Sequence, residues 1–257
     1  MKKLTSFVSE NADLKSYPEG DFLIIEIKQN AFEIVTDLTE SSHLFDLLSL
    51  VDSDPTMKGV FIVNHPDCFS ETEYEAYLRK VLKIKNEDEV DGLSALDRQG
   101  IRKRQINILN HFILSAFKMQ KLIVIGLQGC VVTPFMGASL AADLRFASED
   151  MSFSLAHITF GLHPSGALPY LLPKYIGLSR SKDLLFRGGR IDSKEALKLG
   201  LVSEILPTEN FPQACIQELK RMPPIDLHLI KTTKQLMNIY AGELEHYFEF
   251  ESKISFF

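Results

Sequence analysis

Several kinds of feature are scarce or missing in this chain. Its 257 residues include three cysteines, Cys68, Cys130 and Cys215, which lie far apart with neither metal-ligand spacing nor a disulfide framework. No stretch approaches the roughly 20 apolar residues of a membrane span, and no apolar run follows the basic start at Lys2 and Lys3. We therefore expect a cytoplasmic protein with no bound metal and no membrane contact.

An excess of positive charge is also missing. The formal net charge is −6 and the pI is near 5.7, whereas nucleic-acid binding depends on clustered Lys and Arg that neutralise phosphates. The nearest basic cluster, Arg102-Lys103-Arg104, is short. With 45% hydrophobic and 24% charged residues, the composition predicts a folded protein with a substantial core and excludes a nucleic-acid partner.

The first third of the chain alternates between strand and helix patterns. Short apolar runs at 22–27 and 59–63 predict buried strands. Residues 36–40 have the spacing of a helix start. This alternation favours parallel strands with helices packed outside. Residues 1–20 are predicted to be a tail or edge, a helix is expected after residues 69–74, and the charged segment 83–105 is predicted to be a surface excursion before a helix that carries Ile106 to Phe117.

The stretch 121–177 contains the strongest pattern for a site. A strand at 122–127 is followed by Thr133 and Pro134, which predict an N-cap and a helix that begins at Pro134 and continues through Ala142. The amides of Phe135 and Met136 would then lie at a helix N-terminus, where a developing oxyanion is stabilised. We therefore expect any chemistry to take place here.

Several segments in this order resemble the crotonase (enoyl-CoA hydratase/isomerase) superfamily. They are 121–129, the Asp-x-Arg-x-Ala strand at 142–150, 152–157, 160–164, 168–177 and 188–202. The resemblance implies an α/β fold, a crotonase-like spiral of repeated strand-strand-helix turns over 1–190. A C-terminal helical region over 191–257, truncated relative to the family, would drive homotrimer or hexamer assembly. It also implies an acyl thioester as a small-molecule substrate, with no cofactor except coenzyme A as a substrate carrier.

The resemblance also assigns site residues, with departures from the family pattern. The first oxyanion amide falls on Glu73, in a segment that lacks the usual glycine and aspartate. The second falls on Pro134, which has no N–H to donate, so Phe135 or Met136 would have to substitute. The family's two hydratase glutamates align with Gly137 and His157.

His157 is the leading candidate for catalysis, because histidine transfers protons near neutral pH. A lone histidine beside an apolar strand is also commonly a hydrogen-bonded packing residue, so both interpretations stay open. Candidates for coenzyme A binding are Lys28, Ser70 and Thr72, with Arg79 and Lys80 as further basic side chains.

Three functions follow from these patterns. The first is a divergent enzyme that acts on a thioester of coenzyme A or acyl carrier protein through an oxyanion-stabilised enolate, with His157 as the proton-transfer residue. The second is a catalytically degenerate homologue that serves as a binding or assembly module, as the departures at Pro134 and Gly137 suggest. The third is a hydrolase of a non-thioester ketone. Fold alone does not choose among them.

Overall fold

A mixed seven-stranded sheet forms the centre of the molecule. The computed structural model describes residues 6–82 and 101–254, apart from the side chains at 38–40, 81–82 and 101–106. The strand order is β1 (Ser9–Glu10), β2 (Leu14–Glu19), β3 (Phe22–Ile27), β4 (Gly59–Asn64), β5 (Leu122–Leu127), β7 (Leu144–Ser148) and β10 (Glu204–Leu206). From β3 onward the strands run parallel, and β1 and β2 form an antiparallel edge.

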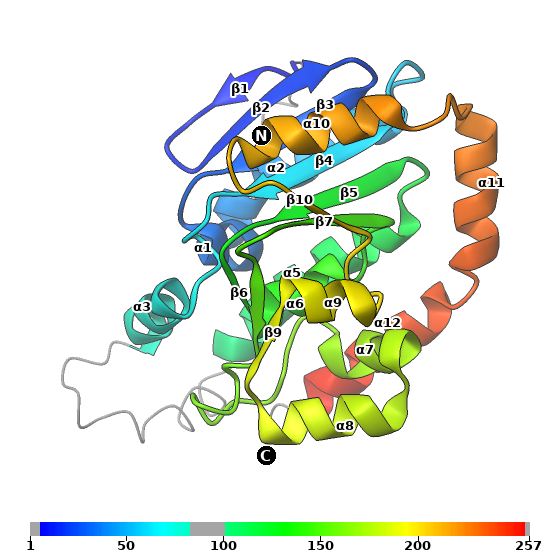
Figure 1. Cartoon of the computed structure of the whole chain (residues 1–257). Helices are drawn as coiled ribbons and strands as arrows, with labels where there is room; N and C mark the ends of the chain where they lie inside the picture. The colour runs from blue at the N-terminus through cyan, green and yellow to red at the C-terminus, as the bar shows by residue number, and fades with distance from the viewer. Residues whose placement is uncertain (1–5, 83–100, 255–257) are drawn as a thin grey trace.

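Helices cover both faces of this sheet, which explains its continuous apolar strands. The larger core contains side chains of α1 (Ala31–Thr36), α2 (Leu38–Ser53) and α5 (Ile101–Lys118). The smaller core lies under α10 (Phe211–Arg221), which crosses the front of the sheet in Figure 1. Side chains alternate between the two cores along β3, since Leu23 and Ile25 join the first and Phe22 and Ile24 the second.

A second, three-stranded sheet positions the candidate site. It has the order β6 (Cys130–Val132), β8 (Ser152–Ser154) and β9 (Arg190–Asp192), with β6 and β8 parallel and β8 and β9 antiparallel. Val132 pairs with Ser154, so α6 (Thr133–Ser139) starts directly beside the end of β8. The small sheet therefore brings the start of α6 close to the turn that contains His157.

The remaining helices lie below and beside the two sheets (Figure 1). Strand β10 belongs to the main sheet and α10 packs on it, whereas α11 stands apart at one side of the molecule (Figure 1). Within the described residues, no helix combines the length and the apolar composition needed to cross a bilayer. The bounds are α3 (Glu71–Leu82), α7 (Leu168–Ile176), α8 (Leu178–Arg187), α9 (Ser193–Lys198), α11 (Leu227–Met237) and α12 (Ala241–Ile254).

Most elements expected in the first third of the chain are confirmed. The strands at 22–27 and 59–63 are present and parallel, and the helix expected after residues 69–74 is α3, which begins earlier, at Glu71. The prediction that residues 1–20 form only a tail or edge missed β2, which pairs antiparallel with β3 along its whole length. The polar residues and Pro18 of β2 do not form the apolar pattern of a buried strand. They are tolerated because β2 lies next to the short edge strand β1. The predicted excursion lies outside the described residues over 83–100, and its last part, 101–105, is instead the start of α5.

The helix start predicted at 36–40 is confirmed, since α1 ends at Thr36 and α2 begins at Leu38. Both ends of α6 differ from the prediction, and the helix ends at Ser139 rather than at Ala142. Thr133 is the first residue of α6 rather than its N-cap, and the cap position is Val132. The Thr133 hydroxyl instead meets His157 and the Ser154 carbonyl. A tertiary contact thus replaces the local cap that the dipeptide predicts.

Candidate active site

His157 lies in the turn after β8 and is buried, with 3% of its surface exposed. Its Nε2 lies 3.1 Å from the Leu185 carbonyl oxygen of α8, and its Nδ1 lies 3.0 Å from Thr133 Oγ1. A carbonyl only accepts, so Nε2 carries the proton toward Leu185. Both ring nitrogens therefore bind the protein's own atoms, and the ring connects α6 to α8.

The expected carbonyl donors do not form a matched pair. Glu73 lies in the first turn of α3, and its amide donates to Ser70 Oγ at 3.2 Å. Pro134 occupies the first turn of α6 and has no N–H. The amides of Phe135 and Met136 follow in the same turn, but both residues are buried. The Glu73 amide is therefore already engaged by a side chain, and the α6 amides lie in the core.

The position of the first hydratase glutamate has no room for a side chain. A Cβ atom built on Gly137 would lie 2.3 Å from the backbone oxygen of Gly166. Gly166 has φ of +72°, and a Cβ on it would lie 2.3 Å from the backbone oxygen of Pro134. The two glycines therefore let the backbones of α6 and the 165–166 segment touch, and this contact excludes a carboxylate at residue 137.

Aromatic side chains fill the space between α1, α3 and α6. We call this group the aromatic plug. The rings of Phe69 and Phe135 stack at 3.9 Å between centroids, and Phe32 lies 4.7 Å from Phe135. The other members are Tyr74 and Tyr77, which stack on Phe32 at 5.1 and 5.2 Å, and Phe160, which meets Tyr74 edge-on at 5.3 Å.

Among the described residues, one small cavity lies beside the aromatic plug. The cavity beside Phe69 and Phe135 measures about 30 Å³ and is lined almost entirely by apolar side chains. That is room for about one water molecule, whereas small-molecule sites usually occupy roughly 300 Å³ or more. The Tyr77 hydroxyl bonds Thr36 Oγ1 at 2.6 Å, and burial raises the pKa of Tyr77 above its usual value. The phenol therefore stays protonated near neutral pH.

The coenzyme A candidates engage other groups of the chain. Lys28 bonds the Glu10 carboxylate at 3.3 Å and the Asn11 carbonyl. Ser70 accepts from Glu73, and Thr72 is exposed. The further basic side chains are also paired, Arg79 with Glu75 and Lys80 with Glu33, each at 2.8 Å. A phosphate would have to compete with these carboxylates.

Cysteine and metal chemistry find no support among the described residues. All three cysteines are free. Burial raises the pKa of Cys68 to about 12 and also raises the pKa of the Cys130 thiol, so neither is a ready nucleophile. The described part of the chain contains no group of three or more His, Cys, Asp or Glu side chains placed to hold a metal ion.

One polar cluster beside the site was not predicted. Glu71 Oε1 accepts from Ser154 Oγ at 2.7 Å and from Arg190 Nη2 at 2.6 Å. These contacts tie the start of α3 to β8 and β9. They join residues 83 and 119 positions apart, so no local motif in the sequence could reveal them.

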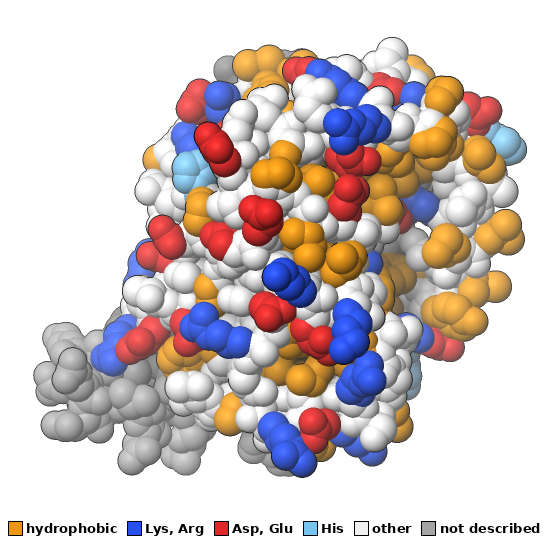
Figure 2. Space-filling view, viewed as in Figure 1, with side chains coloured by type: hydrophobic (Ala, Val, Ile, Leu, Met, Phe, Trp, Pro, Cys, Tyr) orange, Lys and Arg blue, Asp and Glu red, His pale blue; other side chains and the backbone are white. Residues whose placement is uncertain are grey.

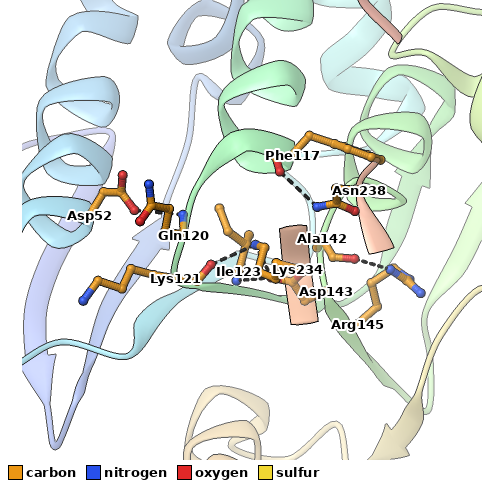
Figure 3. Close-up of polar contacts among 10 residues, drawn as sticks. All are labelled: Asp52, Phe117, Gln120, Lys121, Ile123, Ala142, Asp143, Arg145, Lys234 and Asn238. Atoms are coloured by element: carbon orange, nitrogen blue, oxygen red, sulfur yellow. Dashed lines mark hydrogen bonds and ion pairs between the residues drawn. The ribbon is translucent and has the colours of Figure 1, made fainter. Parts of the chain in front are cut away.

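The Asp-x-Arg motif has structural partners, shown in Figure 3. Asp143 Oδ2 accepts from Lys234 Nζ at 2.6 Å and from the Ile123 amide at 2.7 Å. Lys234, buried on α11, also donates to the Lys121 carbonyl at 2.8 Å. Arg145 donates to the carbonyls of Ala142 and Leu201 at 2.6 and 2.7 Å. These residues hold α11 and the 201–203 segment to the main sheet.

The seven-stranded and three-stranded sheets, the glycine contact at α6 and the Asp-x-Arg strand define a crotonase-like class of fold. Solved structures share it. An enoyl-CoA hydratase from Bacillus halodurans aligns with a TM-score of 0.77 at 22% identity over 94% of this chain and 93% of its own. ThnE from S. clavuligerus aligns with a TM-score of 0.71 at 14% identity, over 94% and 99%. At these identities the likeness concerns the fold.

Sequence comparison then identifies the family. The family model for enoyl-CoA hydratase/isomerase matches residues 99–255, and this chain belongs to that family. It is 31% identical over 159 residues to a probable enoyl-CoA hydratase EchA12 of Mycobacterium tuberculosis, covering 61% of this chain and 56% of that protein. It is 27% identical over 143 residues to the human testis-specific chromodomain protein Y 2, covering 55% and 26%. The match thus spans about half or less of these relatives.

Proposed function

We propose that this chain is a crotonase-fold protein that has lost enolate chemistry at the inherited site and serves as a binding or assembly module. The aromatic plug carries the proposal. Phe69 and Phe135 stack between the segment that leads to Glu73 and the start of α6, where an acyl thioester would need to enter. A plugged site leaves no space in which to orient a substrate, and orientation is a large part of catalysis.

Three further features support the same function. Pro134 has no amide to donate, and Gly137 has no space for a carboxylate. His157 is held by Thr133 and Leu185 on opposite sides of its ring. Pro134 thus removes one oxyanion donor, and Gly137 removes one acid-base group. The other candidate acid-base group, His157, is occupied by hydrogen bonds within the protein. The free cysteines favour a reducing compartment such as the cytoplasm as the place where the module acts.

Calorimetry and turnover assays test the loss of chemistry. With crotonyl-CoA, acetyl-CoA and free coenzyme A, we expect no binding heat up to millimolar ligand. With a panel of enoyl and malonyl thioesters, we expect no turnover above the uncatalysed rate, because the ligand would have to displace buried aromatic rings. A family member with both glutamates serves as the positive control. Saturable turnover by the wild-type chain would overturn the proposal.

Membership of the family favours a second candidate, a divergent enzyme that acts on a thioester of coenzyme A or acyl carrier protein. In that case the amides near Glu73 and at Phe135 or Met136 would bind the carbonyl after the rings move aside. His157→Ala would then reduce turnover by about a hundredfold or more. Turnover that survives this substitution would show that His157 is not the proton-transfer residue and that another residue performs this step.

Assembly is the function that the surface of α11 supports. Large apolar side chains on α11 and the turn after it are more than half exposed, namely Leu229, Leu236, Met237, Ile239 and Tyr240. A groove of about 360 Å³ separates α11 from the body and is lined by apolar residues that include Phe117, Leu140 and Ile225. Figure 2 shows the hollow and the apolar side chains around it. Such a surface is typical of a subunit contact, and by family resemblance we propose a homotrimer or hexamer.

Charge substitutions on α11 test the assembly. In the double variant Leu236→Glu with Ile239→Glu, carboxylates replace two apolar side chains that are 73% and 75% exposed. Because neither side chain is in the core, folding should be preserved. We expect sedimentation velocity to show loss of the oligomer at micromolar concentration. Val8→Glu is the matched control, since Val8 is 66% exposed on a different part of the surface. A wild-type chain that is monomeric at high concentration would contradict the proposal.

A further inference from the structure

A second surface, on α8, carries an exposed aromatic side chain surrounded by positive charge. Phe186 is 81% exposed and Leu178 is 60% exposed. With Lys182 between them at a spacing of four, these three residues share one face of the helix. We call this face the α8 ridge. An exposed phenylalanine with neighbouring basic groups is typical of an interface anchor.

The segment around the α8 ridge is positive in an acidic chain. Residues 174–198 contain seven Lys or Arg against three Asp or Glu, a net of +4, whereas the whole chain carries −6. Some of these cations have acidic neighbours, Arg187 with Asp183 and Arg190 with Glu71, both at 2.6 Å. Arg180, Lys182 and Lys194 have no ion pair within the described residues. The ridge thus has unbalanced positive charge.

A groove between α2 and α5 has the complementary character. It measures about 440 Å³, large enough for an aromatic ring and a lysine stem. Phe45, Leu48 and Met119 supply its apolar lining, and Asp46 and Asp52 supply carboxylates. Its one lysine, Lys118, is paired with Glu245 of α12, so the net charge offered by the groove is negative.

The ridge and the groove lie on different parts of the same chain. In Figure 1, α8 forms the lower edge of the molecule, while α2 and α5 lie behind the main sheet. We propose that the α8 ridge of one copy docks into the α2/α5 groove of a second copy, with Phe186 on the apolar lining and Lys182 facing Asp46 and Asp52. Because the two surfaces differ, the contact is heterologous and generates a ring or a filament. This goes beyond the assembly proposed for α11 and uses none of its residues.

The test uses the full chain with the α11 contact removed by Leu236→Glu and Ile239→Glu. In this background we expect salt-sensitive self-association by sedimentation velocity, stronger at 50 mM than at 500 mM NaCl, because the pairing is partly electrostatic. Phe186→Ser should weaken the dissociation constant about 30-fold, as expected for loss of an interface anchor. Asp46→Lys should weaken it by reversing the groove charge.

Mixing the two variants tests whether the ridge of one copy binds the groove of another. A chain with Phe186→Ser keeps its groove, and a chain with Asp46→Lys keeps its ridge, so the mixture should form a dimer that neither forms alone. Failure of the mixture to associate would overturn the proposal. Self-association that is insensitive to both substitutions, or absence of association in the α11 background, would also overturn it. If the wild-type chain is oligomeric and the chain with Leu236→Glu and Ile239→Glu is monomeric, the assembly through α11 is supported and only the ridge–groove contact is rejected.

Discussion

Replacement of Lys234 by methionine is expected to lower the free energy of unfolding by about 3 kcal/mol. The substitution keeps the apolar stem but leaves the Asp143 carboxylate without its cation, and removing one partner of a buried pair costs roughly 3–5 kcal/mol. Lys234 is 7% exposed, and its ammonium lies 2.6 Å from Asp143 Oδ2. We choose the lower end of the range because the Asp143 side chain is 20% exposed. Urea denaturation at one fixed protein concentration measures the change, because assembly adds to apparent stability.

Two companion variants show whether the uncompensated charge is the cause. Adding Asp143→Asn to Lys234→Met removes that charge and keeps an oxygen for the Ile123 amide, so part of the loss should be recovered. Lys118→Met breaks an exposed pair with Glu245 and should cost less than about 1 kcal/mol. If Lys234→Met and Lys118→Met have equal effects, the Lys234–Asp143 pair does not anchor α11 as we describe.

Gly137→Ala is expected to destabilise the chain by about 3 kcal/mol or to prevent folding. Helix propensity alone would make this change favourable by up to about 1 kcal/mol, so the sign of the effect separates local from tertiary control. The new Cβ would meet backbone oxygens of Gly166 at 2.3 Å and Ser165 at 3.0 Å. Since backbone atoms cannot rotate away like a side chain, the 165–166 segment must shift, and overpacking of this kind costs roughly 1–3 kcal/mol or more.

Gly242→Ala provides the matched control. Gly242 lies in α12, and a Cβ on it would meet nothing within 4 Å. We expect this variant to be as stable as the wild type or more stable by up to about 1 kcal/mol. Thermal or urea unfolding of the two variants together gives the comparison. A Gly137→Ala protein with wild-type stability would show that the backbone contact can relax, and that a glutamate could be restored at residue 137.

Local patterns in the sequence predicted the frame of the fold well. The apolar runs that become β3, β4 and β5 are bounded by turn residues, and their period identifies them without help from distant segments. The start of α6 was predicted within one residue because Pro134 favours a first helical turn. β2 was missed because a strand beside a short edge strand keeps polar residues and a proline.

The site could be predicted only in part. The sequence drew attention to Pro134, Gly137 and His157 as departures from one family pattern, and the lack of an N–H at Pro134 follows from its covalent structure. What surrounds these residues depends on segments far away in the chain. Thr133 meets His157 across 24 positions, and Glu71 meets Arg190 across 119. A pattern read along the chain carries no information on such contacts.

The sequence by itself determined the alternation of strands and helices and the absence of an N–H at Pro134, because strand periodicity and the chemistry of proline are local properties. Only the tertiary structure decided that three phenylalanine rings stack against one another beside the start of α6. Phe32 comes from α1, Phe69 from the turn before α3 and Phe135 from α6, and each alone is an ordinary core phenylalanine. Their stacking depends on how α1, α3 and α6 pack together, since filling a pocket is a property of summed volumes rather than of any single residue.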